Sequence, residues 1–190
     1  MKESKSAVRL LYASAVFIAS AVVFCAVFAP LLAPYDPSAV SPEEILEHSS
    51  AAHWFGTDAL GRDILSRVIY GARSSVAFAF CSAFCTMALG LSLGMVSGYF
   101  GGLADKSVQC LVALFQGLPG TSLMIAIAAI LPENDFRIII ALTLTSWTGF
   151  SRIVRNEVLR IKGETYMEGI RSIGAGHWYI LRKYVFPNLL

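Results

Sequence analysis

Long runs of apolar residues without a charged side chain dominate the pattern of this 190-residue chain. Four such runs cover residues 10–35, 74–104, 107–132 and 138–151. A helix needs about 20 mostly apolar residues to cross a bilayer, so the first three runs are long enough. The fourth run would reach only about 21 Å, so it spans only if Phe136 and Arg137 extend it and Arg152 snorkels. The pattern predicts an all-α polytopic bundle with four membrane spans, and a re-entrant fourth segment is the alternative.

The composition also indicates a membrane protein. Hydrophobic residues make up 56% of the chain and charged residues 15%, and the mean hydropathy is +0.63. Soluble domains have about 45–50% apolar and about 25% charged residues. A soluble domain of this length cannot bury so much apolar surface, which excludes most cytosolic enzymes and any disordered or fibrous protein. The formal net charge of +2 is too small to indicate a nucleic-acid partner.

Basic residues are unevenly distributed between the segments that flank the runs. Three precede residue 10 and seven lie between residue 151 and the end, whereas residues 33–73 contain only three. Because Lys and Arg concentrate on the cytoplasmic side, both ends are predicted to be cytoplasmic, which requires an even number of spans. The predicted segments are a cytoplasmic tail (1–9), a first span (10–34), an extracytoplasmic loop (35–73), a second span (74–100), a third span (107–131), an outer turn (132–135), a fourth span (136–152), a cytoplasmic loop (153–186) and the start of a fifth span (187–190).

Two local patterns inside the runs predict how the helices pack and bend. Small residues recur every fourth position in the second run, at Ser82, Thr86, Gly90, Gly94 and Gly98. Such a stripe lets another helix backbone approach closely. In the third run Pro119 lies between two glycines, which predicts a kink. The kink either lines a translocation path or serves packing alone.

The sequence contains no group of residues with an evident chemical role. None of the four runs contains a charged residue, so proton relays and intramembrane active sites are not indicated. His48, His53 and His177 lack the spacing of a zinc site, and no glycine-rich phosphate loop occurs. We therefore expect no catalytic residue, no metal and no cofactor on this chain, so any ATP would be bound by another chain.

A short amphipathic helix is predicted in the cytoplasmic loop, at residues 164–173. Tyr166, Ile170 and Ile173 fall on one face of it. At about ten residues the helix is too short to be stable alone. It needs either a groove on another protein or the membrane surface.

The same segment resembles the EAA loop of ABC importer permeases. Residues 168–174 read Glu-Gly-Ile-Arg-Ser-Ile-Gly and are followed by Ile180 and Pro187. The EAA pattern is Glu-Ala-Ala, three residues, Gly, then an apolar residue and a Pro. Gly169 and Ile170 stand where alanines are usual, so the match rests on the Glu and the Gly at its two ends.

A second resemblance is more extensive. Residues 53–67, continuing to 70–75, are similar to the segment before the second helix in permeases of the dipeptide, oligopeptide and nickel family. The motif residues in this segment are Gly56, Thr57, Asp58, Gly61, Arg62 and Asp63. Gly101 and Gly102 with Asp105, and Trp147 followed by residues 152–155, also look like that family. The resemblance therefore runs over nearly the whole chain.

The resemblance implies a type I ABC importer permease in the inner membrane, with its N-terminus in the cytoplasm. Its partners would be a second permease subunit, two ATP-hydrolysing subunits, an extracytoplasmic solute-binding protein and the lipid bilayer. The predicted helix would be the coupling helix that docks on an ATPase. The residues assigned to this coupling are Tyr166, Met167, Glu168, Gly169, Ile170, Arg171 and Gly174. The outer motif would help form the face that meets the binding protein, and local Asp–Arg pairing in a solvated loop is the alternative.

The cargo and the functional class have alternatives at this stage. We favour peptides because no residues are arranged to bind a metal, and a nickel permease of the same family is the alternative. A non-transport membrane scaffold is a further alternative, in which the small-residue stripe forms a homodimer and the amphipathic segment binds headgroups. Family members continue through two more helices, so the chain is expected to be truncated near residues 187–190.

Overall fold

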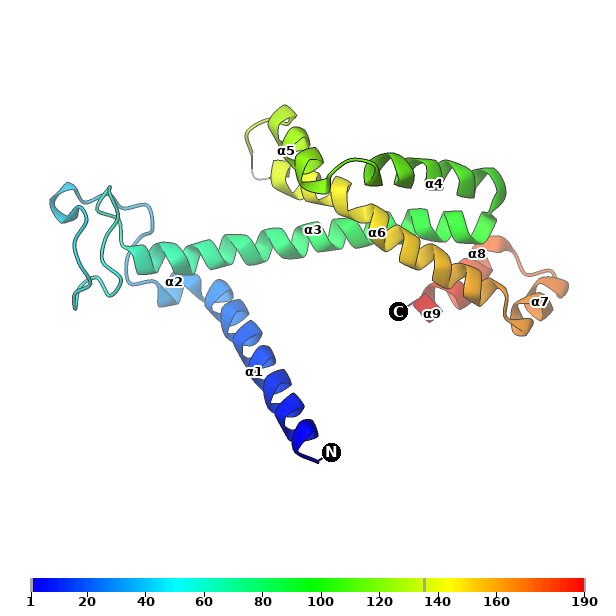
Figure 1. The fold of residues 1–190 in the computed structure, drawn as a ribbon, viewed down its shortest axis with the longest axis horizontal. Coiled ribbons are helices and arrows are strands. Elements are labelled where there is room, and N and C mark those ends of the chain that lie inside the picture. The colour runs from blue at the N-terminus through cyan, green and yellow to red at the C-terminus, as the bar shows by residue number, and fades with distance from the viewer. Residues whose placement is uncertain (1, 135, 190) are drawn as a thin grey trace. The chain divides into compact units, whose positions relative to one another are not determined.

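The apolar runs form helices throughout the described part of the chain. The computed structural model describes residues 2–134 and 136–189, and their side chains from residue 8 onward. Positions 1, 135 and 190, which belong to the predicted tail, outer turn and fifth span, lie outside the described residues. Every regular element within the described ranges is a helix, which confirms the predicted all-α class (Figure 1). The chain forms two units, Met1–Ala79 and Phe80–Leu190, and each is described by itself.

The first unit begins with a long helix that ends earlier than the predicted first span. Helix α1 covers Lys2–Val27, so residues 2–9 of the predicted tail are part of the same helix, and the short helix α2 covers Ala29–Leu32. The break falls at Phe28, just before Pro30. Proline has no amide hydrogen and its ring collides with the preceding turn, which explains why a single helix does not continue to residue 34.

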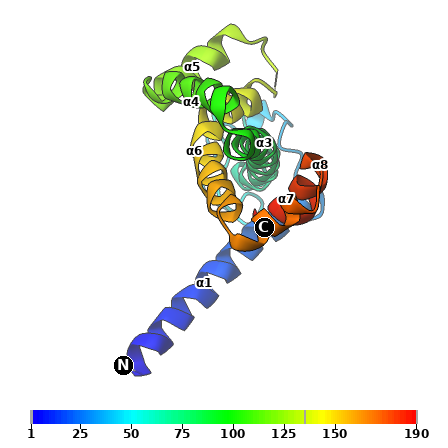
Figure 2. The ribbon, with the colours of Figure 1, turned by 90° about the vertical axis from the view of Figure 1, so that its right-hand side faces the viewer.

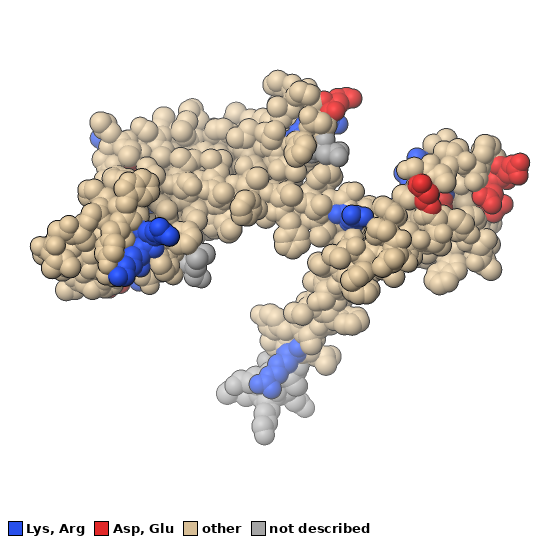
Figure 3. All heavy atoms as spheres, turned by 180° about the vertical axis from the view of Figure 1, so that it is seen from behind, with Lys and Arg blue, Asp and Glu red and all other residues tan. Residues whose placement is uncertain are grey.

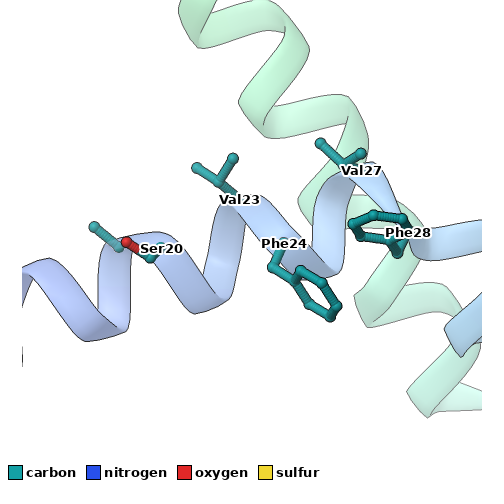
Figure 4. A pocket seen from close by; sticks show the side chains of 6 residues that line it. Ser20, Val23, Phe24, Val27 and Phe28 are labelled. Carbon is teal, nitrogen blue, oxygen red and sulfur yellow. The ribbon is translucent and has the colours of Figure 1, made fainter.

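One face of α1 carries an apolar hollow (Figure 4). Ala19, Ser20, Val23, Phe24, Val27 and Phe28 line it. The Phe24 and Phe28 rings lie with their centroids 4.6 Å apart. Large apolar side chains are exposed along this helix. Such exposure is expected where lipid rather than water surrounds a helix.

Helix α3, Ile64–Phe100, starts ten residues before the predicted second span. The prediction began after Arg73 because it followed the uncharged run, but charged side chains at a membrane surface do not end a helix. At about 1.5 Å per residue its 37 residues reach about 55 Å, well beyond an apolar layer about 30 Å thick. The helix ends at Phe100, because Gly101 has a φ of +68° that few other residues adopt.

The second unit continues with a broken helix pair. Helix α4 covers Gly102–Gln116 and helix α5 covers Gly120–Ile130. Their axes differ by 92° across the break at residues 117–119. Pro119 lies immediately before α5, at the position where the sequence predicts a kink.

The rest of the second unit is one long helix followed by short ones. Helix α6 runs without interruption through Phe136–Lys162, and Figures 1 and 2 both show it beside the second half of α3. The short helices that follow it are α7 (Thr165–Ser172), α8 (His177–Ile180), the π-helical turn η2 (Leu181–Val185) and α9 (Phe186–Leu189).

Fewer helices qualify as membrane spans than the sequence predicts. Within the described residues, Val8–Val27 of α1 and the whole of α3 are long and apolar enough to cross a membrane. The bent pair of α4 and α5 makes a third if it counts as one span. Helix α6 is not among them, because Arg137 and Arg152 bound its 14-residue apolar run. The predicted count of four is therefore not confirmed.

Two apolar clusters hold the second unit together. The larger cluster consists of Tyr99, Val154, Val158, Ile161, Met167, Ile180, Leu181 and Val185. The smaller one consists of Val108, Val112 and Trp147. The larger cluster joins the end of α3 to α6, α7 and α8. The face of the molecule in Figure 3 carries few charged side chains, and these lie in small groups.

Candidate functional site

The small-residue stripe of α3 lies against the backbone of α6. A Cβ added at Gly94 would lie 2.6 Å from the carbonyl oxygen of Ser151, and one at Gly98 would lie 2.9 Å from that of Arg155. At Gly90 the carbonyl oxygen of Trp147 would be 3.0 Å away. At Gly94 and Gly98 these distances are shorter than real Cβ atoms show, and at Gly90 the contact is tight. Since α6 of the same chain covers these glycines, the alternative that they form a homodimer face is wrong.

The first two members of the stripe precede these glycines along α3. Ser82 is buried and Thr86 is half-buried. Both lie nearer the start of the second unit than the glycines do. The close approach of α3 and α6 is therefore centred on the three glycines.

A polar cluster joins three helices near the turn between α3 and α4. Asp105 accepts two hydrogen bonds from Arg155, Nε to Oδ1 and Nη2 to Oδ2, both at 2.6 Å. The Ser97 hydroxyl donates to the same Oδ1 at 2.5 Å, and Gln109 donates to that hydroxyl at 3.3 Å. A two-point Arg–carboxylate contact fixes orientation as well as distance. The cluster therefore fixes the position of α6 relative to the α3–α4 turn.

Helix α7, which contains most of the residues predicted to contact an ATPase, is attached to the body of the unit by Met167. The sequence assigns Met167 to the coupling residues as an apolar anchor, and the structure buries its side chain completely in the larger cluster. Met167 therefore anchors α7 within its own chain, and its role in coupling stays a prediction. Ile170 is half-buried against the same cluster. These two contacts stabilise α7 within the chain, and the rest of its surface stays available to a partner.

The other predicted coupling residues lie on the surface of α7. Tyr166 is 45% exposed and Ile173, directly after the helix, is 84% exposed. Glu168, Gly169, Arg171 and Gly174 are also exposed. Gly174 has a φ of +80°, a backbone conformation that favours glycine, and it ends the turn after α7. Helix α7 therefore exposes apolar and charged side chains on one side, while Met167 on its other side packs into the larger cluster.

Two contacts that the sequence does not reveal connect the ends of α3, α6 and α8. The Tyr99 hydroxyl and Nδ1 of His177 share a hydrogen bond of 3.0 Å. Lys162 at the end of α6 donates from Nζ to the Tyr99 carbonyl oxygen at 2.8 Å. These residues lie more than 60 positions apart, so no local pattern indicates the pairing. They hold together the helices that precede and follow α7 in the sequence.

In the first unit, the outer motif is a tightly closed loop. Gly56 and Gly61 have φ values of +71° and +72°. Cβ atoms added there would lie 2.3 Å from the Glu47 carbonyl oxygen and 1.8 Å from the Ser41 carbonyl oxygen. Both positions therefore require glycine. Thr57 also closes the loop, since its hydroxyl accepts from the Glu47 amide at 2.9 Å.

Asp58 organises the tip of this loop. Its Oδ1 accepts from the amides of Leu60 (2.8 Å) and Arg62 (3.1 Å), and its Oδ2 accepts from Arg62 Nε at 2.9 Å. Arg67 also pairs with this carboxylate. The hydrogen bond from the Arg62 side chain holds the pKa of Asp58 well below its usual range. Asp58 and Arg62 thus pair locally, as the alternative interpretation of the motif predicts.

Asp63 caps α3 and binds a buried histidine. Its Oδ2 accepts from the Ser66 amide at 2.7 Å, the position of a helix cap, and its Oδ1 lies 3.0 Å from Nδ1 of His53. Glu44 lies 3.7 Å from the other ring nitrogen, and the Tyr35 ring packs on the imidazole at 4.7 Å between centroids. Ten residues separate His53 from Asp63, so no local spacing in the sequence indicates this pair.

The contact between His53 and Asp63 shifts the pKa values of both residues. The hydrogen bond with Asp63 raises the pKa of His53 above its ordinary value, although burial opposes this. Burial acts to raise the pKa of Asp63, but the hydrogen bonds from Ser66 and His53 outweigh it and the pKa is lowered. Among the described residues, no group of three or more His, Cys, Asp and Glu side chains is placed to hold a metal ion.

Comparison with known proteins gives matches over most of the chain. Residues 90–190 match the family described as binding-protein-dependent transport system inner membrane component. An oligopeptide transport system permease protein of Bacillus subtilis is 34% identical over 89% of this chain and 55% of its own length. A glutathione transport system permease protein of Pectobacterium atrosepticum is 36% identical over 88% of this chain and 56% of its own length. A dipeptide transport system permease protein of Bacillus subtilis is 37% identical over 92% of this chain and 54% of its own length. The chain thus spans about half the length of the curated relatives it matches.

Proposed function

Because this chain belongs to the binding-protein-dependent transport system inner membrane component family, we propose that it forms part of the translocation path of an ATP-driven peptide importer. The substrate class follows from the names of the relatives, which refer to oligopeptides, dipeptides and glutathione. None of these three names refers to nickel. The proposed partners are a second permease subunit, two ATPase subunits that bind the ATP, and an extracytoplasmic solute-binding protein. The proposed orientation has the N-terminus in the cytoplasm.

The placement of α7 carries this proposal. Met167 anchors the helix in a cluster that also contains Tyr99 of α3 and Val158 of α6. A force applied to the exposed side of α7 therefore acts on both long helices, because a packed core moves as a unit. Tyr166 and Ile173 are the exposed apolar side chains on that side. They are suited to insertion into a cleft of an ATPase, where a few apolar anchors supply most of the affinity.

The outer motif, for which we propose an extracytoplasmic position, supports the same function. Its loop is closed by Thr57, by two glycines that tolerate no Cβ and by Asp63 at the start of α3. A loop with so many internal contacts presents a fixed surface, which lowers the entropy cost of binding a partner. We assign this surface to the contact with the solute-binding protein.

Co-purification of ATPase subunits tests the proposal. The double variant Tyr166→Ala/Ile173→Ala removes exposed apolar groups and leaves Met167 unchanged, so we expect the chain to fold normally. The amount of co-purified ATPase should fall at least tenfold, because two apolar anchors of the interface are truncated. Leu103→Ala is the control, since Leu103 is 82% exposed but lies on α4. Equal recovery of ATPase with all three proteins would overturn the coupling role of α7.

A further inference from the structure

Helix α8 begins beside the end of the long helix α3. The Tyr99 hydroxyl lies 3.0 Å from Nδ1 of His177, and the ring centroids of Phe100 and His177 are 5.9 Å apart. Helix α3 is long and apolar enough to cross a membrane, and Phe100 is its last residue. His177 therefore lies beside the end of a helix that is long enough to cross a membrane.

The segment from His177 to Val185 has two chemically different faces. The buried face consists of Ile180, Leu181 and Val185. The exposed face consists of Trp178, Tyr179, Arg182 and Lys183. Trp178 is 83% exposed, which is unusual for the largest apolar side chain unless lipid or a partner contacts it. We call these four residues the basic aromatic face.

The polar groups of this face are arranged around a shallow hollow. Tyr179, Arg182 and Lys183 line it, and its volume is about 330 Å³. Lys183 donates from Nζ to the Tyr179 hydroxyl at 2.7 Å, and the same Nζ lies 5.0 Å from the ring centroid. In the described part of the chain neither cation lies within ion-pair distance of a carboxylate. The hollow thus combines two cations that lack an anionic partner with an aromatic wall.

This chemistry suits one class of ligand. A phosphodiester offers oxygens to the planar guanidinium of Arg and to the compact ammonium of Lys. Trp and Tyr side chains are favoured at the membrane–water interface, where one end contacts lipid and the other contacts water. The cytoplasmic leaflet is negatively charged and attracts juxtamembrane basic residues.

We propose that the basic aromatic face binds the headgroup of an anionic phospholipid in the cytoplasmic leaflet. The proposal rests on α3 crossing the membrane and on the cytoplasmic side proposed above for residues 153–186, but not on ATPase docking. Charge complementarity and the exposed rings of Trp178 and Tyr179 favour a lipid over a soluble protein. A bound lipid stabilises α8, and through Leu181 and Val185 it stabilises the cluster that holds Met167.

Native mass spectrometry of the detergent-purified chain tests this proposal. The chain is titrated with phosphatidylglycerol and, separately, with zwitterionic phosphatidylcholine. In Arg182→Gln/Lys183→Gln we expect the apparent affinity for phosphatidylglycerol to fall about 30-fold, with phosphatidylcholine binding unchanged. The charge-matched control is Lys106→Gln/Arg160→Gln, which removes two exposed cations from other helices. We expect this control to stay within about threefold of the original chain.

Three results would overturn the lipid site. An equal loss in both double variants would mean that net charge alone attracts the lipid. Displacement of the lipid by millimolar inorganic phosphate would indicate a site for small anions. Unchanged lipid binding combined with loss of co-purified ATPase would make the face a protein interface. The lipid titration contains no ATPase, so its failure is distinct from failure of the proposed transport function.

Discussion

Truncation of Met167 is the most direct perturbation of the link between α7 and the membrane helices. In Met167→Ala, the fully buried side chain that joins α7 to the larger cluster is lost, while the exposed surface of the helix keeps its residues. Truncating a buried Met to Ala costs about 2–5 kcal/mol. Helix α7 has only eight residues, so it is barely stable without its contacts to the rest of the unit. Most of this loss therefore appears as detachment of α7.

The magnitude of the expected change follows from these quantities. A loss of about 2 kcal/mol raises the population of the detached state about 30-fold, because each 1.4 kcal/mol is a factor of ten. Local opening governs amide exchange in small, weakly attached elements. We therefore expect the α7 amides to exchange at least 30-fold faster in Met167→Ala. The amides of α3 exchange at unchanged rates, because its contacts with α6 at the glycines are intact.

Hydrogen exchange followed by mass spectrometry in detergent or nanodiscs measures this difference. Ile173→Ala is the matched control, because it truncates an apolar side chain of the same segment that is 84% exposed. A surface change of this kind alters stability by no more than about 0.5 kcal/mol, or about twofold in exchange. If both variants exchange alike, or if α3 opens together with α7, the assignment of Met167 as the anchor of α7 is refuted.

Three further measurements examine other parts of the structure. Gly94→Ala places a Cβ 2.6 Å from a carbonyl oxygen of α6, so we expect it to destabilise the chain by about 1–3 kcal/mol. Gly71→Ala on the same helix meets no atom within 4 Å and should stabilise the chain by up to about 1 kcal/mol. If thermal unfolding ranks the two variants the other way, the close approach of α3 and α6 is contradicted. Arg155→Lys keeps the charge but loses the two-point contact with Asp105, so we expect a loss of about 1–2 kcal/mol in denaturant unfolding, and a neutral result argues against that contact. Because folding raises the pKa of His53, the histidine stabilises the outer loop fully at pH values below its ordinary pKa of 6.5, and this stabilisation is lost as the pH rises through the higher pKa of the folded state. Amide exchange of the loop, corrected for intrinsic rates, should therefore accelerate with rising pH. The same acceleration in His53→Gln would exclude His53 as the cause.

The helices were largely predictable because each depends on a local property. An uncharged apolar run of bilayer length forms a helix whatever surrounds it, and such runs lie within α1, α3 and the pair of α4 and α5. The ends of the helices were less predictable where a single residue, rather than the extent of the apolar run, decides where the helix begins or ends. Pro30 ends α1 early, and Asp63 starts α3 ten residues before the uncharged run begins. The chain's family could likewise be inferred, since its motifs are short and contiguous.

The sequence by itself determined the all-α class, the membrane environment, the positions of the small-residue stripe and the kink, and the resemblance to importer permeases. Only the tertiary structure decided which apolar side chains are internal. An apolar side chain can face the core of its own chain or a binding partner, so hydrophobicity does not distinguish Met167 in the core from Ile173 on the surface. The structure alone also paired Asp105 with Arg155 and His53 with Asp63. Such pairs form when folding brings distant segments together, and no spacing along the chain encodes them.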